Sequence, residues 1–367
     1  MFFSNGAHTL DKSLFYTTLA LFLGGLLTLA SASMVLSQKS FGLSGYYVLR
    51  QLLLGGVGGA IGLLAASRIS YRLWKRLAIP LMLLSLALLV FLFIPELSYS
   101  FGGAKRWISI GPLSFQPSEI LKFSFLVYLA GWLAARKDEV KSISRGMIPF
   151  TLMLSVVGIF LLMQPDIGTL GVIAISAGML YFLGGGKTSQ IITLFLFGLV
   201  MFYFIVQLAP YRLDRITTFL NPAADPQGIG YQINQAFIAI GSGGFWGRGL
   251  GMSLQKYQYL PEPMGDSIFA IFAEETGFLG VVVFIGLFGF FLWRGFAIAY
   301  RAPDLFGRLL AAGITMGITV QAFINMAAIS GLLPLTGIPL PFVSYGGTSL
   351  VVTLTQIGVL LNIAKHI

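Results

Sequence analysis

Long apolar runs separated by short polar segments recur along the whole chain of 367 residues. A helix that crosses a bilayer needs roughly 20 apolar residues, because the hydrocarbon layer is about 30 Å thick and each helical residue rises about 1.5 Å. Only structures that satisfy their own backbone hydrogen bonds span lipid, so the runs predict a helical bundle. We expect an all-α, polytopic membrane protein in a single integral domain covering residues 1–367. The ten predicted spans are Leu14–Leu36, Tyr46–Ala66, Leu77–Ile94, Gln116–Ala135, Met147–Met163, Gly168–Leu183, Gln190–Ala209, Ser267–Trp293, Leu309–Ile329 and Phe342–Ile363.

Two segments rich in Pro and Gly interrupt this pattern at membrane depth. Gln164-Pro165-Asp166 separates two short runs, which are either two spans or one broken element. The second segment, residues 335–349, contains Ser344. Broken helices free backbone groups, which is tolerated where the backbone lines a cavity. The hydroxyls of the second segment therefore either serve a cavity or accompany glycines that only allow close helix packing.

The positions of Lys and Arg predict the orientation of the bundle, because cytoplasmic loops carry the excess of these residues. Alternate loops divide the loop cations into two sets, one twice as large as the other, and the larger set places both termini in the cytoplasm. The larger set is Lys12, Arg68, Arg72, Lys75, Arg76, Arg136, Lys137, Lys141, Arg145, Lys187, Arg294, Arg301, Arg308 and Lys365. The smaller set is Lys39, Lys105, Arg106, Arg212, Arg215, Arg248 and Lys256.

The longest connection, residues 210–266, falls on the outer side in this arrangement. It is the least apolar stretch of the chain and far longer than a bundle needs to join two neighbouring helices. We interpret it as an extracytoplasmic loop between the seventh and eighth spans. The next-longest outer loop, residues 95–115, adds further charges, so polar chemistry is expected on the outer face.

Composition narrows the kind of chemistry that this face can perform. Apolar residues make up 56% of the chain and charged residues only 10%, which argues against a water-soluble domain. Cysteine is absent, and the two histidines, His8 and His366, lie at the chain ends. A thiolate nucleophile and a Cys-based metal site are therefore excluded, and a His-centred site is disfavoured. Carboxylates, cations, hydroxyls and backbone groups remain.

Glu119 and Lys122 fall within the outer part of the fourth predicted span. Ionisable groups inside a membrane cost a few kcal/mol each unless they are paired or face water. The i, i+3 spacing puts both side chains on one helix face, where they can pair. Pro117 suits the first helical turn, and the helix dipole favours an anion at Glu119. The pair is either a structural ion pair or part of a functional cavity.

A second group of acids surrounds the start of the eighth predicted span. Residues 260–267 contain two prolines and a glycine, which predict a non-helical entry with Asp266 as the helix N-cap. Glu274 and Glu275 follow within the apolar run. They lie either deep in the span or on an interfacial helix over 266–276, with the span proper beginning at Gly277.

Four stretches of the chain resemble one known family. Phe115–Glu119, Gln164–Thr169, Tyr259–Ala270 and Gly337–Gly347 occur in the order and composition seen in the SEDS proteins FtsW, RodA and SpoVE. The resemblance covers nearly the whole chain from the second span onward, and ten spans with cytoplasmic termini fit the family. Many members have His-Thr-Asp-Phe where this chain has Met264-Gly265-Asp266-Ser267, so the aspartate is retained in a different local setting.

The resemblance implies a peptidoglycan glycosyltransferase in the bacterial cytoplasmic (inner) membrane. Such an enzyme polymerises lipid II at the outer face, beside a class B penicillin-binding transpeptidase, in cell division or cell-shape maintenance. Asp266 matches the proposed catalytic aspartate of the family, and Glu119 with Lys122 matches the pair that faces it, so the resemblance implies that these three are the catalytic residues. Residues 224–232 look more like the division branch than the elongation branch. Membrane lipids are expected partners, and nucleic acid is not.

The chemistry of lipid II suits these residue types. The α-linked pyrophosphate on MurNAc is displaced by a GlcNAc 4-hydroxyl to give a β-linkage, so the reaction inverts the anomeric centre and needs one carboxylate base. Pyrophosphate leaves as a stable anion, which requires positive charge rather than a proton. We expect Asp266 to be the base. The expected substrate-binding residues are Arg50, Lys105, Arg106, Arg212, Arg215 and Ser344.

Other interpretations remain open from the sequence. Mg²⁺ or Mn²⁺ could bridge the pyrophosphate and a carboxylate, although no spacing identifies a metal site, and the basic side chains could instead be interfacial snorkellers. A transporter (flippase) of a lipid-linked precursor would also use buried charges and broken helices. A scaffold that only recruits an enzyme would leave Glu119 and Lys122 without a reason to be buried.

Overall fold

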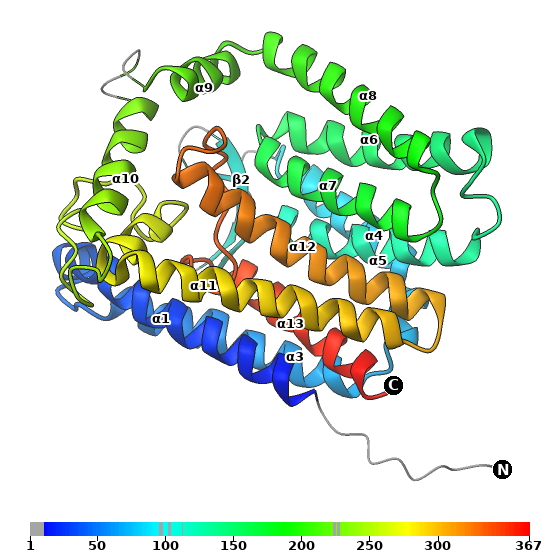
Figure 1. Ribbon diagram of the computed structural model, residues 1–367, viewed down its shortest axis with the longest axis horizontal. Helices are drawn as coiled ribbons and strands as arrows, with labels where there is room; N and C mark the ends of the chain where they lie inside the picture. Colours follow the sequence, from blue (N-terminus) through cyan, green and yellow to red (C-terminus); the bar gives the residue numbers. More distant parts are fainter. Residues whose placement is uncertain (1–10, 95–97, 102–103, 112, 223–224, 226–227) are drawn as a thin grey trace.

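Figure 1 shows a bundle whose long helices run back and forth between two ends of the molecule. The computed structural model describes residues 11–94, 98–101, 104–111, 113–222, 225 and 228–367. Its helices are α1 (Lys12–Phe41), α2 (Tyr46–Arg50), α3 (Gly58–Arg68), α4 (Arg72–Phe91), α5 (Pro117–Ala135), α6 (Ile148–Met163), α7 (Ile167–Leu183), α8 (Thr188–Gln207), α9 (Pro210–Leu220), α10 (Ile229–Gly243), α11 (Ile268–Arg301), α12 (Leu305–Ile329) and α13 (Gly347–Ala364).

The predicted all-α, polytopic fold is confirmed. Within the described residues, nine helices are long and apolar enough to cross a membrane, and α7 is a shorter apolar helix of 17 residues. The second span is continuous, because the π-helical turn η1 (Gln51–Val57) joins α2 to α3. α6 and α7 are separate helices on either side of Pro165, whose positive φ of 30° breaks the path of the chain. Another π-helical turn, η2 (Ile143–Met147), leads into α6.

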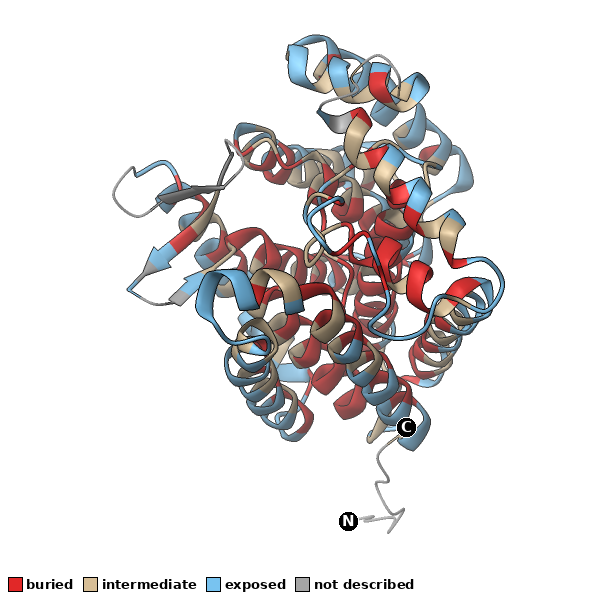
Figure 2. Cartoon of the chain, turned by 90° about the vertical axis from the view of Figure 1, so that its left-hand side faces the viewer, coloured by how far each residue is buried: buried red, intermediate tan, exposed pale blue. Residues whose placement is uncertain are grey.

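The centre of the bundle is formed by α5, α12 and α13, whose apolar faces are the most buried of the candidate spans. Figure 2 looks along the bundle and shows buried residues gathered in the middle and exposed ones around the rim. α8 lies at the periphery and buries little of its surface, as expected for a helix that faces lipid. Asp11 and Asp304 cap α1 and α12, accepting hydrogen bonds from Leu14 N at 3.0 Å and Gly307 N at 2.8 Å.

The outer connections contain more regular structure than the hydrophobic pattern indicated. A three-stranded antiparallel sheet of β1 (Ser98–Phe101), β2 (Ala104–Ile110) and β3 (Leu113–Phe115) precedes α5. Tyr99 pairs with Trp107, and Ile108 pairs with Phe115. α9 and α10 lie within residues 210–266. These strands and helices are too short, and too amphipathic, to stand out as apolar runs.

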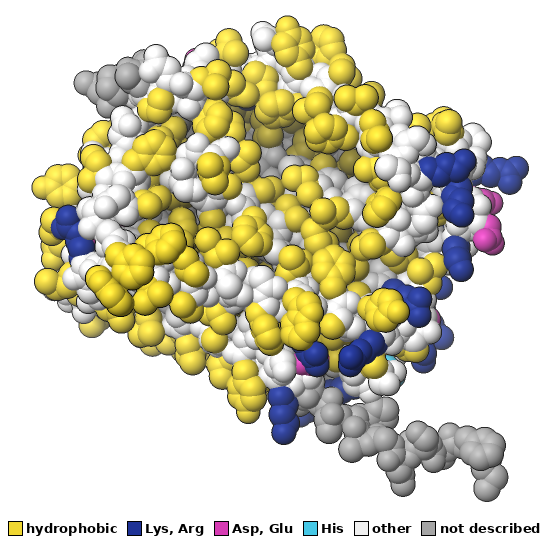
Figure 3. All heavy atoms as spheres, in the orientation of Figure 1, with side chains coloured by type: hydrophobic (Ala, Val, Ile, Leu, Met, Phe, Trp, Pro, Cys, Tyr) yellow, Lys and Arg dark blue, Asp and Glu magenta, His cyan; other side chains and the backbone are white. Residues whose placement is uncertain are grey.

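Lys and Arg side chains gather at one end of the molecule, on the right of Figure 3. The described chain begins and ends near this end, at α1 and α13 (Figure 1). α11 starts at the opposite end, so Asp266 lies far from the cationic loops. That the cationic end faces the cytoplasm stays a prediction.

Candidate active site

Two non-helical segments, residues 260–267 and 335–346, meet where α11 begins, and Asp266 belongs to the first. Its carboxylate Oδ1 accepts hydrogen bonds from Gln232 Nε2 of α10 at 3.4 Å and from Ser267 Oγ at 3.5 Å. A Cβ on Gly337 would lie 3.9 Å from Oδ2, so the second segment borders the carboxylate at Gly337. The prediction that Asp266 caps the helix is wrong. Ser267 occupies the N-cap position, and no side chain bonds the first turn, so the carboxylate is not engaged in capping.

The backbone on both sides of Asp266 is clamped. Asn325 Nδ2 of α12 donates to Asp266 O at 2.9 Å and to Ile338 O at 2.8 Å. Ser344 Oγ donates to Gly265 O at 2.6 Å, and Tyr345 N donates to Met264 O at 2.8 Å. These bonds join the two segments residue by residue. The carboxylate is therefore presented by a fixed backbone, which favours preorganisation.

Gln51, buried at the start of η1, supports the same clamp from the second span. Its Nε2 donates to Ser344 O at 3.3 Å, and its Oε1 accepts from Gly346 N at 3.1 Å. Ser344 Oγ also accepts from Leu340 N at 2.8 Å. Ser344 thus uses its hydroxyl within the clamp, a geometry that suits holding the loop better than contacting a substrate.

Burial raises the pKa of Asp266 to about 6, and the negative charge of Glu262 adds to the increase. The positive charge of Arg215 and the hydrogen bond from Gln232 act in the opposite direction. A carboxyl with this pKa is ionised near neutral pH and still takes up a proton readily. That is the property expected of a general base.

Of the predicted cations, Arg215 lies close to Asp266, and it also lies close to Arg106 and to a second carboxylate. Arg215 of α9 is near enough to Asp266, Asp166 and Arg106 for their charges to act on it, and burial and Arg106 lower the pKa of its guanidinium. Arg215 Nη1 donates to Leu335 O at 2.9 Å. Arg106 Nε of β2 donates to Gln164 O at 3.3 Å, two residues before Asp166. The structure therefore gathers mixed charge beside the predicted base.

Asp166 was not among the predicted site residues. Its Oδ1 caps α7 by accepting from Thr169 N at 3.1 Å, whereas its buried Oδ2 has no hydrogen-bond partner among the described residues. Its position in the Gln164–Thr169 motif was the signal in the sequence that could have identified it as a site residue. A buried carboxylate oxygen without a partner is costly, so its position beside Arg106 and Arg215 compensates through charge.

The other predicted cations lie in different surroundings. Arg212 bridges the ends of α8 and α6, donating to Ile205 O at 2.8 Å and Leu162 O at 3.4 Å. Arg50 lies beside Tyr345, where its charge acts on the phenol. The side chain of Lys105 lies outside the described part of the structure.

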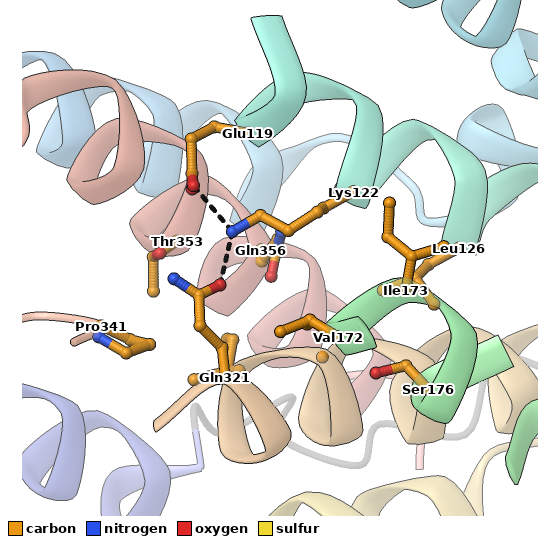
Figure 4. Close-up of a pocket in the computed structure, with 12 residues that line it drawn as sticks. Glu119, Lys122, Leu126, Val172, Ile173, Ser176, Gln321, Pro341, Thr353 and Gln356 are labelled. Carbon is orange, nitrogen blue, oxygen red and sulfur yellow. Dashed lines mark hydrogen bonds and ion pairs between the residues drawn. The ribbon is translucent and has the colours of Figure 1, made fainter. Parts of the chain in front are cut away.

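Glu119 and Lys122 form a buried ion pair, with 2.7 Å between Lys122 Nζ and Glu119 Oε1. Figure 4 shows the ammonium between this carboxylate and the Oε1 of Gln321, to which it also donates. The cavity beside the pair has a volume of about 20 Å³, room for about one water molecule. Asp266 does not line it. The pair therefore lies beside a pocket that is too small for a sugar.

α12 connects this pocket to Asp266. Gln321 accepts a hydrogen bond from the Lys122 ammonium and donates one to Pro339 O at 2.9 Å. Asn325, one turn further along, donates to the backbone carbonyls of Asp266 and Ile338. Both amides were missed from the sequence. Polar side chains four residues apart in an otherwise apolar run share one helix face, and this was the signal that could have revealed them.

Within the described part of the chain, no three side chains of Asp, Glu, His or Cys are grouped as metal ligands. Mg²⁺ in enzymes is often held by one or two carboxylates together with substrate phosphates. A divalent cation in this region would accordingly take most of its ligands from a bound pyrophosphate.

Comparison with known proteins gives consistent matches over nearly the full length. The family model described as "Cell cycle protein", which covers FtsW, RodA and SpoVE, matches residues 11–367. Stage V sporulation protein E of Bacillus subtilis (strain 168) is 40% identical over 356 residues, 97% of each chain. A probable peptidoglycan glycosyltransferase FtsW of Trichlorobacter lovleyi is 41% identical over 357 residues, 96% of this chain and 93% of that one.

Solved structures share the fold. A chain of a peptidoglycan synthase complex that coordinates polymerisation and crosslinking superposes with a TM-score of 0.79 and 28% identity, covering 97% of this chain and 98% of that one. The rod shape determining protein RodA of Thermus thermophilus superposes with a TM-score of 0.71 and 28% identity, covering 98% of both chains.

Proposed function

The chain belongs to the FtsW, RodA and SpoVE family, a family of peptidoglycan glycosyltransferases, and we propose that it polymerises lipid II into glycan strands at the outer face of the bacterial cytoplasmic membrane. It is a multi-pass membrane protein and an enzyme. Cell division or cell-shape maintenance is the setting that the names of its relatives support. A class B penicillin-binding transpeptidase is the proposed partner, because a structural neighbour is part of a synthase complex that also crosslinks.

The observation that carries this proposal is the ionisable carboxylate of Asp266, held on a clamped backbone within reach of the positive charge of Arg215. In the proposed reaction, Asp266 removes the proton from the GlcNAc 4-hydroxyl as that oxygen attacks the anomeric carbon of MurNAc. The bond from that carbon to the pyrophosphate breaks, and the polyprenyl pyrophosphate leaves as an anion. Attack from the opposite face converts the α-linkage into a β-linkage.

Arg215 and Arg106 are the proposed partners of the pyrophosphate, because the charge of Arg215 acts on Asp266 and Arg106 lies near enough to act on Arg215. Arg50, Lys105 and Arg212 are proposed to contribute from the surrounding surface. Cations aimed at the leaving group stabilise the charge that develops there.

Glu119 and Lys122 are proposed to act through Gln321, which connects them to Pro339 O in the segment that borders Asp266. Ser344 is proposed to support the base through its bond to Gly265 O. These residues position the base and do not need to touch the reacting atoms.

The direct test incubates the purified protein with lipid II, with and without the partner transpeptidase, and separates the glycan products by electrophoresis. We expect Asp266→Asn to abolish polymer, since the amide cannot accept the proton, while the clamp through its backbone carbonyl is kept. Asp214→Asn, at an exposed carboxylate of α9, is the matched control and should polymerise normally. Full activity of Asp266→Asn would refute the assignment.

A second measurement separates polymerisation from transport. In sealed vesicles, a flippase would move labelled lipid II between leaflets without forming polymer. Translocation that persists in Asp266→Asn, combined with no polymer from the parent protein, would favour the transporter.

A further inference from the structure

Residues 244–259, hereafter the 244–259 loop, join α10 to the segment that carries Asp266 and have two chemically different sides. Polar side chains on the inner side are buried against α1 and α11, whereas large apolar side chains point outward. The glycosyl transfer proposed above uses neither side. The buried contacts of the inner side hold the loop in one conformation, and the exposed apolar side chains of the outer side form a surface suited to a binding partner.

Glu274 fixes the inner side of the loop from α11. Its buried carboxylate accepts hydrogen bonds from Ser253 Oγ, from Leu254 N at 3.0 Å and from Gln255 N at 3.4 Å. Arg248 Nε lies 3.7 Å from Oε1 of the same group. Three consecutive residues of the loop are thus tied to one carboxylate.

Glu275 and Lys256 form the second attachment. Lys256 is buried, and its ammonium lies 3.5 Å from Glu275 Oε1 and donates to Ser31 Oγ of α1 at 3.0 Å and to Gly251 O. Glu275 Oε1 also accepts from Ser253 N at 3.2 Å. Removing one member of such a buried network is strongly destabilising, so the loop is held in one conformation.

The outer side of this rigid loop is apolar and exposed. Trp246 has 76% of its surface exposed. Isolated exposed apolar side chains are common on proteins, but a contiguous group on one short segment marks an interaction surface. The group comprises Phe245, Trp246, Leu250, Met252, Leu254 and Tyr257.

This surface continues the exposed apolar stripe of α11. The ring of Phe245 stacks on Phe278 with centroids 5.8 Å apart, Phe278 N donates to Gly244 O at 2.9 Å, and Leu279 N donates to Phe245 O at 3.2 Å. The stripe then runs along the span through Phe278, Leu279, Val282 and Val283, all exposed on a membrane-crossing helix. In Figure 3, many hydrophobic side chains lie at the left-hand end of the molecule, where α11 begins, with a small group of basic atoms at the edge.

We propose that the 244–259 loop is a membrane anchor, whose outer side lies in the boundary between headgroups and acyl chains at the Asp266 end of the bundle. Trp and Tyr are enriched at this depth, and an apolar face of this kind is buried about 5–10 Å into the boundary. The partly exposed Arg248 lies where its guanidinium can reach the headgroups. Because Leu260–Asp266 follows directly, the anchor sets the height of Asp266 above the lipid.

The test measures contact between Trp246 and lipid. A single-tryptophan protein is made by replacing Trp74, Trp107, Trp132 and Trp293 with Phe. It is reconstituted into phosphatidylcholine vesicles whose acyl chains carry bromine near the carbonyl group. We expect Trp246 to lose roughly half of its emission relative to unbrominated vesicles, as for a side chain at the headgroup boundary.

The matched control keeps Trp293 alone, on the exposed face of α11 within the span, and shows that the brominated lipid quenches a lipid-facing tryptophan. Retained polymerisation by both proteins shows that they are folded. Unchanged Trp246 emission in vesicles that quench Trp293 would overturn the proposal. Emission of Trp246 that shifts only when the partner transpeptidase is added would also overturn it, and would identify a protein docking surface instead.

Discussion

Asp266 combines a fixed backbone with a lightly bonded carboxylate. Asn325 and Ser344 hold the carbonyls of Asp266 and Gly265, whereas the hydrogen bonds that the carboxylate accepts from Gln232 and Ser267 are long, at 3.4 and 3.5 Å. A base held in this way keeps its orientation and still has lone pairs for a substrate hydroxyl.

The raised pKa of Asp266 predicts how polymerisation depends on pH. The ionised carboxylate is the active form, so the rate should rise with pH through about 6 and fall below it as the group is protonated. Glu262→Gln removes a negative charge and should move this midpoint to lower pH. Arg215→Gln removes a positive charge and should move it to higher pH. Initial polymerisation rates measured from pH 5 to 8 give the midpoint of the pH profile for the unchanged protein and for the two variants. Equal midpoints in all three proteins would contradict this account.

The Glu119 and Lys122 pair allows structural and functional roles to be separated. Glu119→Gln leaves the Lys122 ammonium buried without its carboxylate and should lower the free energy of unfolding by about 3–5 kcal/mol. Glu119→Gln combined with Lys122→Met removes both charges and should recover most of the melting temperature in detergent. Polymerisation should stay low in the double variant, because Gln321 loses the ammonium that orients it. Recovery of both properties would make the pair purely structural.

At the scale of elements, α11 is two helices joined at a kink. Gly277 has φ 67° and ψ −168°, so residues 268–276 form a short helix that carries Glu274 and Glu275, and the span proper follows. Of the two arrangements left open by the sequence, the break at Gly277 is the one found. The kink lets the short helix face the 244–259 loop while the remainder of α11 crosses the bilayer.

Gly277→Ala should therefore disturb the loop. A Cβ at Gly277 would lie 2.2 Å from Gly247 N, and the left-handed backbone adds strain of about 1–3 kcal/mol. We expect a lower melting temperature and reduced polymerisation. Gly286→Ala, in the same helix with nothing within 4 Å of its Cβ, is the control and should be neutral or slightly stabilising. Equal effects of the two substitutions would contradict the role given to the kink.

At the scale of the whole molecule, the cationic loops and the Asp266 segment occupy opposite ends of the bundle. If the positive-inside rule sets the orientation, the cationic end faces the cytoplasm. The chain has no cysteine, which makes single-cysteine labelling clean. Leu220→Cys, at an exposed position of α9, should react with an impermeant maleimide in intact cells. Lys141→Cys should react only after permeabilisation, and the reverse pattern would invert the topology.

The membrane class, the ten apolar segments and the important charged positions can be inferred from the sequence alone, because a bilayer admits only long apolar helices and makes every buried charge conspicuous. The i, i+3 spacing likewise predicted the Glu119 and Lys122 pair, since it depends only on helix geometry. Which distant groups meet depends on how the helices pack in three dimensions. Asn325, Gln51 and Ser344 come from three separate parts of the chain, and their hydrogen bonds around Asp266 follow from helix packing that no local pattern contains. The same packing brings Gln321 to Lys122, accommodates the break of α11 at Gly277 and leaves the apolar side of the 244–259 loop exposed.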